Sequence, residues 1–188
     1  AAGGGDGVRG RAPEDLDAEF VAFVDRRARR HLRAAALLTG DWHTAEDLVQ
    51  TCLVKLYRAW PRLGPDVDLD AYLRRMLVNT NRSWWRARWR REAPVATVPD
   101  RAGEDGQDAH DRAATVRQAL RALPARQRAV LVLRFYEDLP VAEVADLLGC
   151  SAGAVKTHTH RGIRRLRQLL AAEAAIGSSE EEHHGSRR

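Results

Sequence analysis

The chain has 188 residues, 44% of them hydrophobic and 30% charged, which suits one medium domain or two small ones. It contains no apolar run of the roughly 18–20 residues that a membrane span needs. Its net charge of +5 favours a polyanionic partner, and all but two of its 31 lysines and arginines are arginines. The two isolated cysteines, Cys52 and Cys150, disfavour a metal site and fit a reducing, cytoplasmic environment. The Gly-rich residues 1–12 have the composition of a disordered head and lack the apolar core of a signal peptide.

Three amphipathic helices are predicted in the first half of the chain. Apolar residues recur at three- and four-residue steps over residues 14–39, and Gly40 then provides a stop signal. Thr44 is the expected N-cap of the second helix, which ends at Pro61. The third helix is expected over residues 70–91, a segment in which seven arginines and one acid give a net charge of +6. Its second half interleaves arginines with three tryptophans, Trp84, Trp85 and Trp89.

This arginine and tryptophan pattern suits single-stranded or melting DNA. Arginines neutralise phosphates, and indole faces stack on exposed bases. The alternative is that some of the tryptophans are core residues. Because the three span two sides of a helix, we expect at least one of them to be buried.

A change of composition separates the two halves of the chain. Residues 92–111 contain six acids and one arginine, a net charge of −5, without apolar periodicity, so residues 92–112 are predicted to be a flexible linker. Short helices follow over residues 113–172, and the polar residues 173–188 are expected to form a disordered tail. No segment shows a strand pattern. The predicted fold class is all-α, with two small helical domains joined by the linker.

The strongest local motif is a helix-turn-helix over residues 140–170. Pro140 opens an eight-residue helix, Gly149 tolerates the positive φ of a sharp bend, and Ser151 caps a long basic helix. Such a second helix presents its N-terminal side chains to the major groove, where base edges are distinguishable. The outward positions are Lys156, Thr157, His160 and Arg161. The alternative is a plain helical hairpin with a solvated basic face.

The order of these segments resembles the extracytoplasmic-function (ECF) sigma factors of the sigma-70 family, and in particular its actinobacterial SigE-like members. Residues 44–50, Thr-Ala-Glu-Asp-Leu-Val-Gln, and residues 72–85 are similar to the region that binds polymerase and the −10 promoter element. Residues 120–170 are similar to the domain that recognises the −35 element. The resemblance implies that residues 13–91 form sigma domain 2 and residues 113–172 form sigma domain 4.

The resemblance also implies roles for individual residues. Contacts with the −35 element would come from Ser151, Gly153, Lys156, Thr157, His160, Arg161 and Arg164. Contacts with the −10 element would come from Arg75, Asn79, Arg82, Trp85 and Arg86, and Asn79, with the loop near residues 64–69, would hold a flipped base. The clamp helices of the largest polymerase subunit would be bound by Asp47, Leu48, Gln50 and Thr51, although Thr51 stands where the family usually has an acid. The implied partners are core RNA polymerase, through its clamp helices and flap, and promoter DNA. An anti-sigma factor is a further candidate.

Two other classes of protein are alternatives to a sigma factor. The residues Val-Lys-Thr-His at 155–158 also resemble LuxR-type regulators, but such a regulator should carry a sensor or receiver domain with alternating strands and helices. An enzyme should bring acid, base or nucleophilic residues together, whereas the histidines are scattered and catalytic motifs are absent. We therefore expect a sigma factor that is not an enzyme, without a metal or cofactor, in the cytoplasm.

Overall fold

The computed structural model describes residues 13–89 and 107–185, and every regular element within these ranges is helical. The first half contains α1 (Pro13–Thr39), α2 (Trp42–Ala59), a 3-10 turn (Trp60–Arg62) and α3 (Leu69–Trp89). The second half contains α4 (Gln107–Arg121), α5 (Ala125–Leu131), a π-helical turn (Val132–Tyr136), α6 (Val141–Leu148) and α7 (Ala152–Gly185). The predicted all-helical fold class is confirmed. Among the described helices, none has the length and apolar character needed to cross a membrane.

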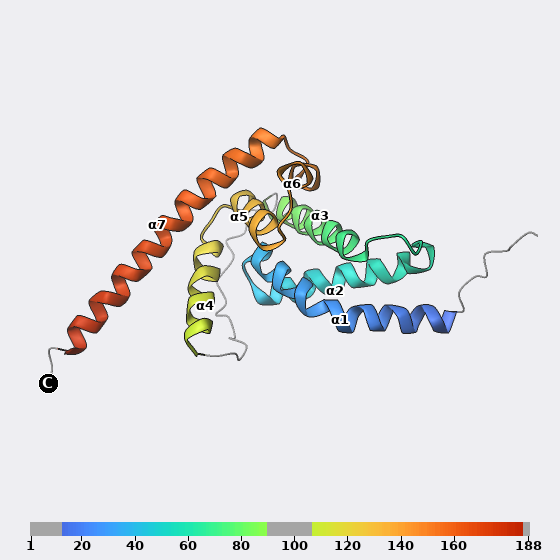
Figure 1. The fold of residues 1–188 in the computed structure, drawn as a ribbon, viewed down its shortest axis with the longest axis horizontal. Helices are drawn as coiled ribbons and strands as arrows, with labels where there is room; N and C mark the ends of the chain where they lie inside the picture. Colours follow the sequence, from blue (N-terminus) through green and yellow to red (C-terminus); the bar gives the residue numbers. More distant parts are fainter. Residues whose placement is uncertain (1–12, 90–106, 186–188) are drawn as a thin grey trace, which may run out of the picture.

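The three helices of the first half enclose one apolar core. The apolar stripe of α2 is buried against Phe23 of α1 and against Leu73 and Leu77 of α3. Figure 1 shows α1 and α2 running side by side, with α3 beyond them. The aromatic rings of Phe20 and Trp60 meet edge to face at the end of α2, with their centroids 5.2 Å apart. This core keeps the exposed faces of α2 and α3 in a fixed relation to each other.

The junction between α1 and α2 confirms one sequence prediction and corrects another. Gly40 ends α1 with a φ of 78°, and its amide donates to the carbonyl of Ala36 at 2.8 Å, as expected of a stop signal. The N-cap of α2 is Asp41, so the prediction of Thr44 is wrong. The Asp41 carboxylate accepts a hydrogen bond from the amide of Thr44 at 2.7 Å. A carboxylate is favoured there because the free amides and the helix dipole both attract negative charge.

The helical segments of the second half extend beyond the boundaries predicted from composition. Helix α4 begins at Gln107, inside the predicted linker, and α7 continues to Gly185, through most of the predicted disordered tail. Alanines and glutamates are frequent over residues 171–182, and both favour a helical backbone. The predicted head and residues 92–106 of the predicted linker lie outside the described residues.

The π-helical turn changes which side chains of the second half are buried. Phe135 is 61% exposed, whereas Leu133 is fully buried. A π turn inserts one residue into the helical repeat and therefore rotates the residues that follow it. Glu137 follows directly, and it becomes a buried charged residue.

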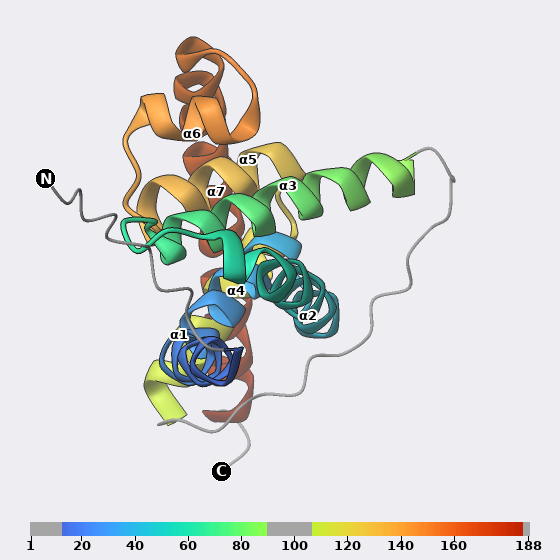
Figure 2. The same cartoon turned by 90° about the vertical axis from the view of Figure 1, so that its right-hand side faces the viewer.

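The two halves pack against each other rather than standing apart. Leu38 of α1 and Val78 of α3 belong to the same buried cluster as Val130, Leu133 and Val144 of the second half. Figure 2 shows α6 above α3, and it shows α7 running behind α5, against which it packs. We call this contact between the halves the seam, formed by α1 and α3 on one side and by α4, α5, the π turn and α6 on the other.

Candidate nucleic-acid interface

The helix-turn-helix has the geometry that its turn residues predicted. Gly149 ends α6 with φ 61° and ψ 48°, a left-handed conformation that glycine adopts without steric cost. The Ser151 hydroxyl accepts a hydrogen bond from the amide of Ala154 at 3.1 Å, which confirms the expected cap. Val155 is fully buried and anchors the start of α7 in the core. The orientation of the basic helix is therefore set by local turn chemistry, by Val155 and by the packing of Ile163, Leu166 and Leu169 further along.

The structure brings all seven predicted −35 residues to solvent. Ser151, Gly153, Lys156, Thr157, His160, Arg161 and Arg164 are each exposed. From Gly153 to Arg164 their spacing gives them a common side of the helix opposite Val155, and Ser151 caps the helix just before them. We call this set the recognition stripe. His158 lies away from it and is half-buried, and burial, followed by the charges of Arg126 and Arg161, lowers its pKa.

A second stripe of predicted DNA contacts lies along α3. Arg75, Asn79 and Arg86 are exposed, whereas Arg82 and Trp85 are half-buried. Trp84 packs against the core of the first half but is half-buried, so neither Trp84 nor Trp85 is the buried tryptophan that was expected. The side chain of Trp89 is outside the described residues. Trp84 and Trp85 line a common cavity, so Trp84 contacts both this cavity and the core of the first half.

Arg82 of this α3 stripe contacts the second half of the chain. Its Nη1 donates to the carbonyl of Leu148 at 2.8 Å, at the end of α6. Its Nε atom is buried without a hydrogen-bond partner in the described structure. A −10 candidate on α3 therefore contacts the turn of the helix-turn-helix directly.

The predicted polymerase surface on α2 divides into exposed and buried residues. Asp47 and Gln50 are exposed, and Thr51 is half-buried. Leu48 is fully buried. The prediction that Leu48 contacts polymerase is not supported by this structure, because its side chain belongs to the apolar stripe that α2 packs against α1 and α3.

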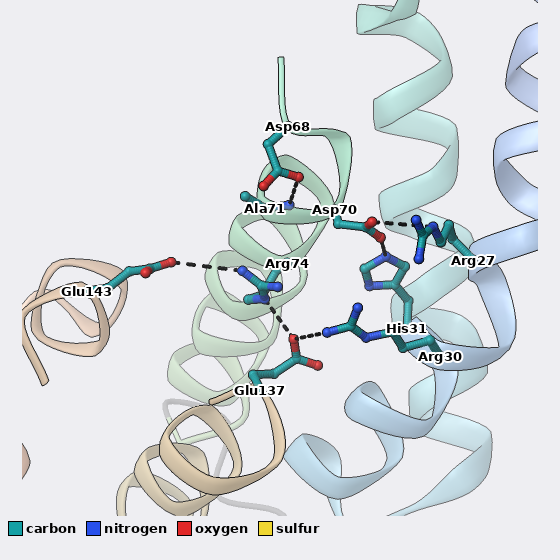
Figure 3. A network of polar contacts seen from close by, with 9 residues as sticks. All are labelled: Arg27, Arg30, His31, Asp68, Asp70, Ala71, Arg74, Glu137 and Glu143. Atoms are coloured by element: carbon teal, nitrogen blue, oxygen red, sulfur yellow. Dashed lines mark hydrogen bonds and ion pairs between the residues drawn. The ribbon is translucent and has the colours of Figure 1, made fainter. Parts of the chain in front are cut away.

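Glu137 forms an ion-pair cluster across the seam that the sequence did not reveal. Its Oε2 atom lies 2.8 Å from Nε of Arg74 and 3.5 Å from Nη2 of Arg30, and its side chain is 3% exposed. Both arginines belong to the first half, as Figure 3 shows. Arg74 also reaches the more exposed Glu143, with Nη1 and Oε1 3.9 Å apart. The buried carboxylate of Glu137 therefore depends on the other half of the chain for its charge partners.

A buried histidine lies in the first half beside this cluster. The Nε2 atom of His31 lies 2.8 Å from a carboxylate oxygen of Asp70, which also pairs with Arg27 at 3.4 Å (Figure 3). Burial lowers the pKa of His31, although the hydrogen bond to Asp70 acts in the opposite direction. Burial therefore favours the neutral form of the His31 ring, which lies beside the ion pairs of Glu137 (Figure 3).

Arg128 makes a second bridge across the seam. Its guanidinium donates to the carbonyls of Leu38 at 2.9 Å and Thr39 at 3.1 Å, at the end of α1, and to the carbonyl of Arg121 at 3.1 Å, at the end of α4. Carbonyls at helix C-termini lack intrahelical donors and carry partial negative charge, so a guanidinium satisfies several of them together. Burial, followed by the charge of Arg121, lowers the pKa of Arg128. Composition does not reveal this role, because the chain has many arginines.

A cavity of about 610 Å³ opens where α2, α3, α5 and the start of α7 meet. Its lining includes apolar side chains, four arginines and Asp47. The cavity therefore joins residues predicted for polymerase (Asp47), for the −10 element (Arg82, Trp85 and Arg86) and for the helix-turn-helix (Gly149 and Ala154). Among the described residues, no group of three or more His, Cys, Asp or Glu side chains is arranged to hold a metal ion.

Comparisons with known proteins agree with this arrangement. Residues 23–91 match the family model described as Sigma-70 region 2, and residues 113–166 match Sigma-70, region 4. The RNA polymerase sigma-E factor of Streptomyces avermitilis is 41% identical over 152 residues, which cover 81% of this chain and 85% of that protein. The ECF RNA polymerase sigma factor EcfG of Rhodopseudomonas palustris is 32% identical over 77% of this chain and 81% of that protein.

Two solved structures have a similar fold. The sigma factor RpoE of Bartonella quintana, in complex with the anti-sigma factor NepR, superposes with a TM-score of 0.65 at 26% identity, covering 84% of this chain and 98% of that one. CnrH, in complex with the cytosolic domain of CnrY, superposes with a TM-score of 0.57 at 26% identity, covering 83% of this chain and 90% of that one. With both sigma-70 regions matched in order and relatives at 41% identity, the chain belongs to the sigma-70 family as an ECF RNA polymerase sigma factor.

Proposed function

We propose that the recognition stripe binds the −35 element in the major groove. The observation that supports this role is the exposure of all seven stripe residues beside the buried Val155. Lys156 and Thr157 stand in the first turns, where a recognition helix approaches base edges. Arg164 lies further along α7 and is suited to a phosphate. We assign a base contact to Arg161, because a guanidinium pairs with guanine through two hydrogen bonds.

For the −10 element, we propose that the α3 stripe holds the melted strand. Arg75 and Arg86 would neutralise phosphates, and Trp85 would stack on a base. Asn79 would pair with the edge of a flipped base, because an amide offers both a donor and an acceptor. Flipping a base costs a few kcal/mol, so this pocket must return that free energy through hydrogen bonds and stacking.

On the polymerase side, we propose that Asp47, Gln50 and Thr51 bind the clamp helices of the largest subunit. Purified chain should co-elute with core polymerase and support run-off transcription from a promoter library. The double variant Asp47→Ala plus Gln50→Ala should weaken core binding, whereas Asp25→Ala, at an exposed position of α1, should not. If the double variant binds core polymerase with unchanged affinity, the assignment of this surface is wrong. A protein that binds DNA but never supports run-off transcription would favour a LuxR-like regulator instead.

We further propose that an anti-sigma factor regulates the chain. Both structural relatives described above were solved in complex with partners, one of them an anti-sigma factor. A protein that binds polymerase and promoter DNA works where both are found, so we place the chain in the cytoplasm. We also infer that its role is to bind and position, with the chemistry of RNA synthesis left to the polymerase.

A further inference from the structure

The cavity where α2, α3, α5 and the start of α7 meet carries more positive charge than its own side chains balance. Four arginines line it, Arg82, Arg86, Arg126 and Arg128, and Asp47 is the only carboxylate among its described lining residues. Its volume of about 610 Å³ lies within the range of roughly 300–1,000 Å³ that takes small organic molecules. Guanidinium groups only donate hydrogen bonds, so a complementary occupant has to supply acceptors and negative charge.

Two of these arginines are not engaged by the protein. Arg128 and Arg82 donate to backbone carbonyls, whereas Arg86 and Arg126 are exposed and have no hydrogen-bond or ion-pair partner among the described residues. Arg86 belongs to α3 and Arg126 to α5, so they reach the cavity from different halves of the chain. Like charges at one cavity repel each other, and an anion bound there would replace this repulsion with attraction.

Two buried polar atoms of the lining residues also lack partners. The Nε atom of Arg82 and the Nδ1 atom of His158 are buried without a hydrogen-bond partner in the described structure, and both residues line the cavity. Such atoms are uncommon in folded proteins, because an unmade hydrogen bond in a buried place is costly. The fold therefore does not use up the hydrogen-bonding capacity of the lining.

The inner part of the cavity is apolar and aromatic. Among the lining residues, Leu38, Val78 and Val130 are buried, whereas Trp84 and Trp85 are half-buried. Indole faces stack on flat rings, including those of nucleic-acid bases. The two unpaired arginines are exposed, so they lie toward the opening. This distribution suits a molecule with a flat ring at one end and an anionic group at the other.

We propose that this cavity is a binding site for a free nucleotide, whose phosphates pair with Arg86 and Arg126 and whose base stacks on Trp85. A guanidinium holds a phosphate through two parallel hydrogen bonds, which gives both affinity and orientation. Trp85 and Arg86 are also proposed above to hold the melted −10 strand, but Arg126 lies on α5 and has no part in that proposal. The nucleotide site is therefore distinguished from the strand-binding surface by its dependence on Arg126.

The first test measures binding of GDP to the full-length chain by isothermal titration calorimetry. Loss of a charge-assisted hydrogen bond should weaken GDP binding by Arg126→Gln about ten- to a hundred-fold. The matched control is Arg58→Gln, which removes the same charge from an exposed position of α2 outside the lining and should bind GDP as the unsubstituted chain does. Equal losses in Arg126→Gln and Arg58→Gln would reduce the binding to general attraction and overturn the proposal, as would no saturable binding at millimolar GDP.

The contribution of the base is measured separately from that of the phosphates. Trp85→Leu should weaken GDP binding by about five- to a hundred-fold and leave the binding of inorganic phosphate unchanged, because only the stacking contact is lost. Trp85→Phe keeps an aromatic face and should retain most of the affinity for GDP. If GDP and inorganic phosphate bind the unsubstituted chain with equal affinity, the base makes no contact and the proposed nucleotide class is wrong.

A short single-stranded oligonucleotide separates this site from the strand-binding surface. Arg86→Gln should weaken both GDP and the oligonucleotide, whereas Arg126→Gln should weaken GDP alone. Because both side chains are exposed and unpaired among the described residues, both variants should keep the Tm of the unsubstituted chain. If Arg126→Gln weakens the two ligands equally, the cavity belongs to the strand-binding surface and the proposal is overturned. If the oligonucleotide does not bind but GDP binding still depends on Arg126, the proposed −10 role fails and the nucleotide site stands.

Discussion

Replacing Gly149 with alanine should destabilise the chain through two separable effects. The position has a φ of 61°, and an L-residue with a Cβ pays roughly 1–2 kcal/mol for this left-handed conformation. The new Cβ would also lie 2.8 Å from Nη1 of Arg82, so the guanidinium must move and its bond to Leu148 is lost. A hydrogen bond to a charged group contributes about 1.5–3 kcal/mol. The combined loss of about 3 kcal/mol should lower Tm by roughly 6–12 °C.

Circular dichroism melts of the unsubstituted chain, Gly149→Ala, Arg82→Ala, the double variant and one control would separate these effects. Glycine-to-alanine substitution at Gly149 should cost about 3 kcal/mol in the unsubstituted background but only about 1–2 kcal/mol in an Arg82→Ala background, where no guanidinium is displaced. Gly153→Ala is the matched control, because the nearest heavy atom to its new Cβ is Ser151 Oγ at 3.8 Å and the position is helical. It should leave stability unchanged or raise it by up to about 1 kcal/mol. An equal cost for Gly149→Ala in both backgrounds would refute the contact between Arg82 and the turn.

Three further predictions concern promoter binding and stability. Arg161→Ala should relax specificity at one position of the −35 element, at a cost of about 1–3 kcal/mol, and uniform weakening on every −35 variant would assign it to a phosphate instead. Asn79→Ala should keep its Tm but lose strand opening, measured by permanganate reactivity of thymines, and a pre-melted bubble should restore activity. A variant that the bubble does not rescue would make Asn79 a structural residue. Because burial lowers the pKa of His31, the unfolded chain binds that proton more tightly, so the free energy of unfolding should fall as the pH drops below about 6.5. This fall should be smaller in His31→Gln, and identical pH profiles in urea titrations would exclude the contribution of His31.

The parts of the molecule that sequence predicted best are those fixed by local chemistry. The bend at Gly149 and the cap at Ser151 follow from backbone conformations and side-chain hydrogen bonds that involve only a few neighbouring residues. The apolar periodicity of α2 likewise identified its buried face. That same periodicity places Leu48 in the core. The polymerase contact of Leu48 was predicted from family resemblance alone, which takes no account of periodicity. Periodicity and resemblance thus disagree at Leu48, and the structure follows periodicity.

The first residues of α2 and α4 were harder to predict, because the residues near each of them favour more than one structure. Asp41 and Thr44 are both good capping residues three positions apart, and the carboxylate occupies the cap while Thr44 supplies the amide that it binds. The start of α4 lies within an acidic segment whose composition resembles a linker, yet acidic residues are also favourable in the first turn of a helix. Composition alone does not distinguish these two uses of the same residues.

The seam was beyond prediction because its contacts have no sequence period. Arg128 and Leu38 are 90 positions apart, and Arg74 and Glu137 are 63 positions apart. In a chain with so many arginines, the sequence does not distinguish the few that form contacts across the seam from those that face water. A seam built from such contacts should also be sensitive to salt at its exposed rim, where Arg30 is half exposed, and less so around the buried carboxylate of Glu137. Local chemistry therefore builds each half of the sigma factor, whereas the halves are joined by a few long-range charged contacts and by the buried side chains of Leu38 and Val78.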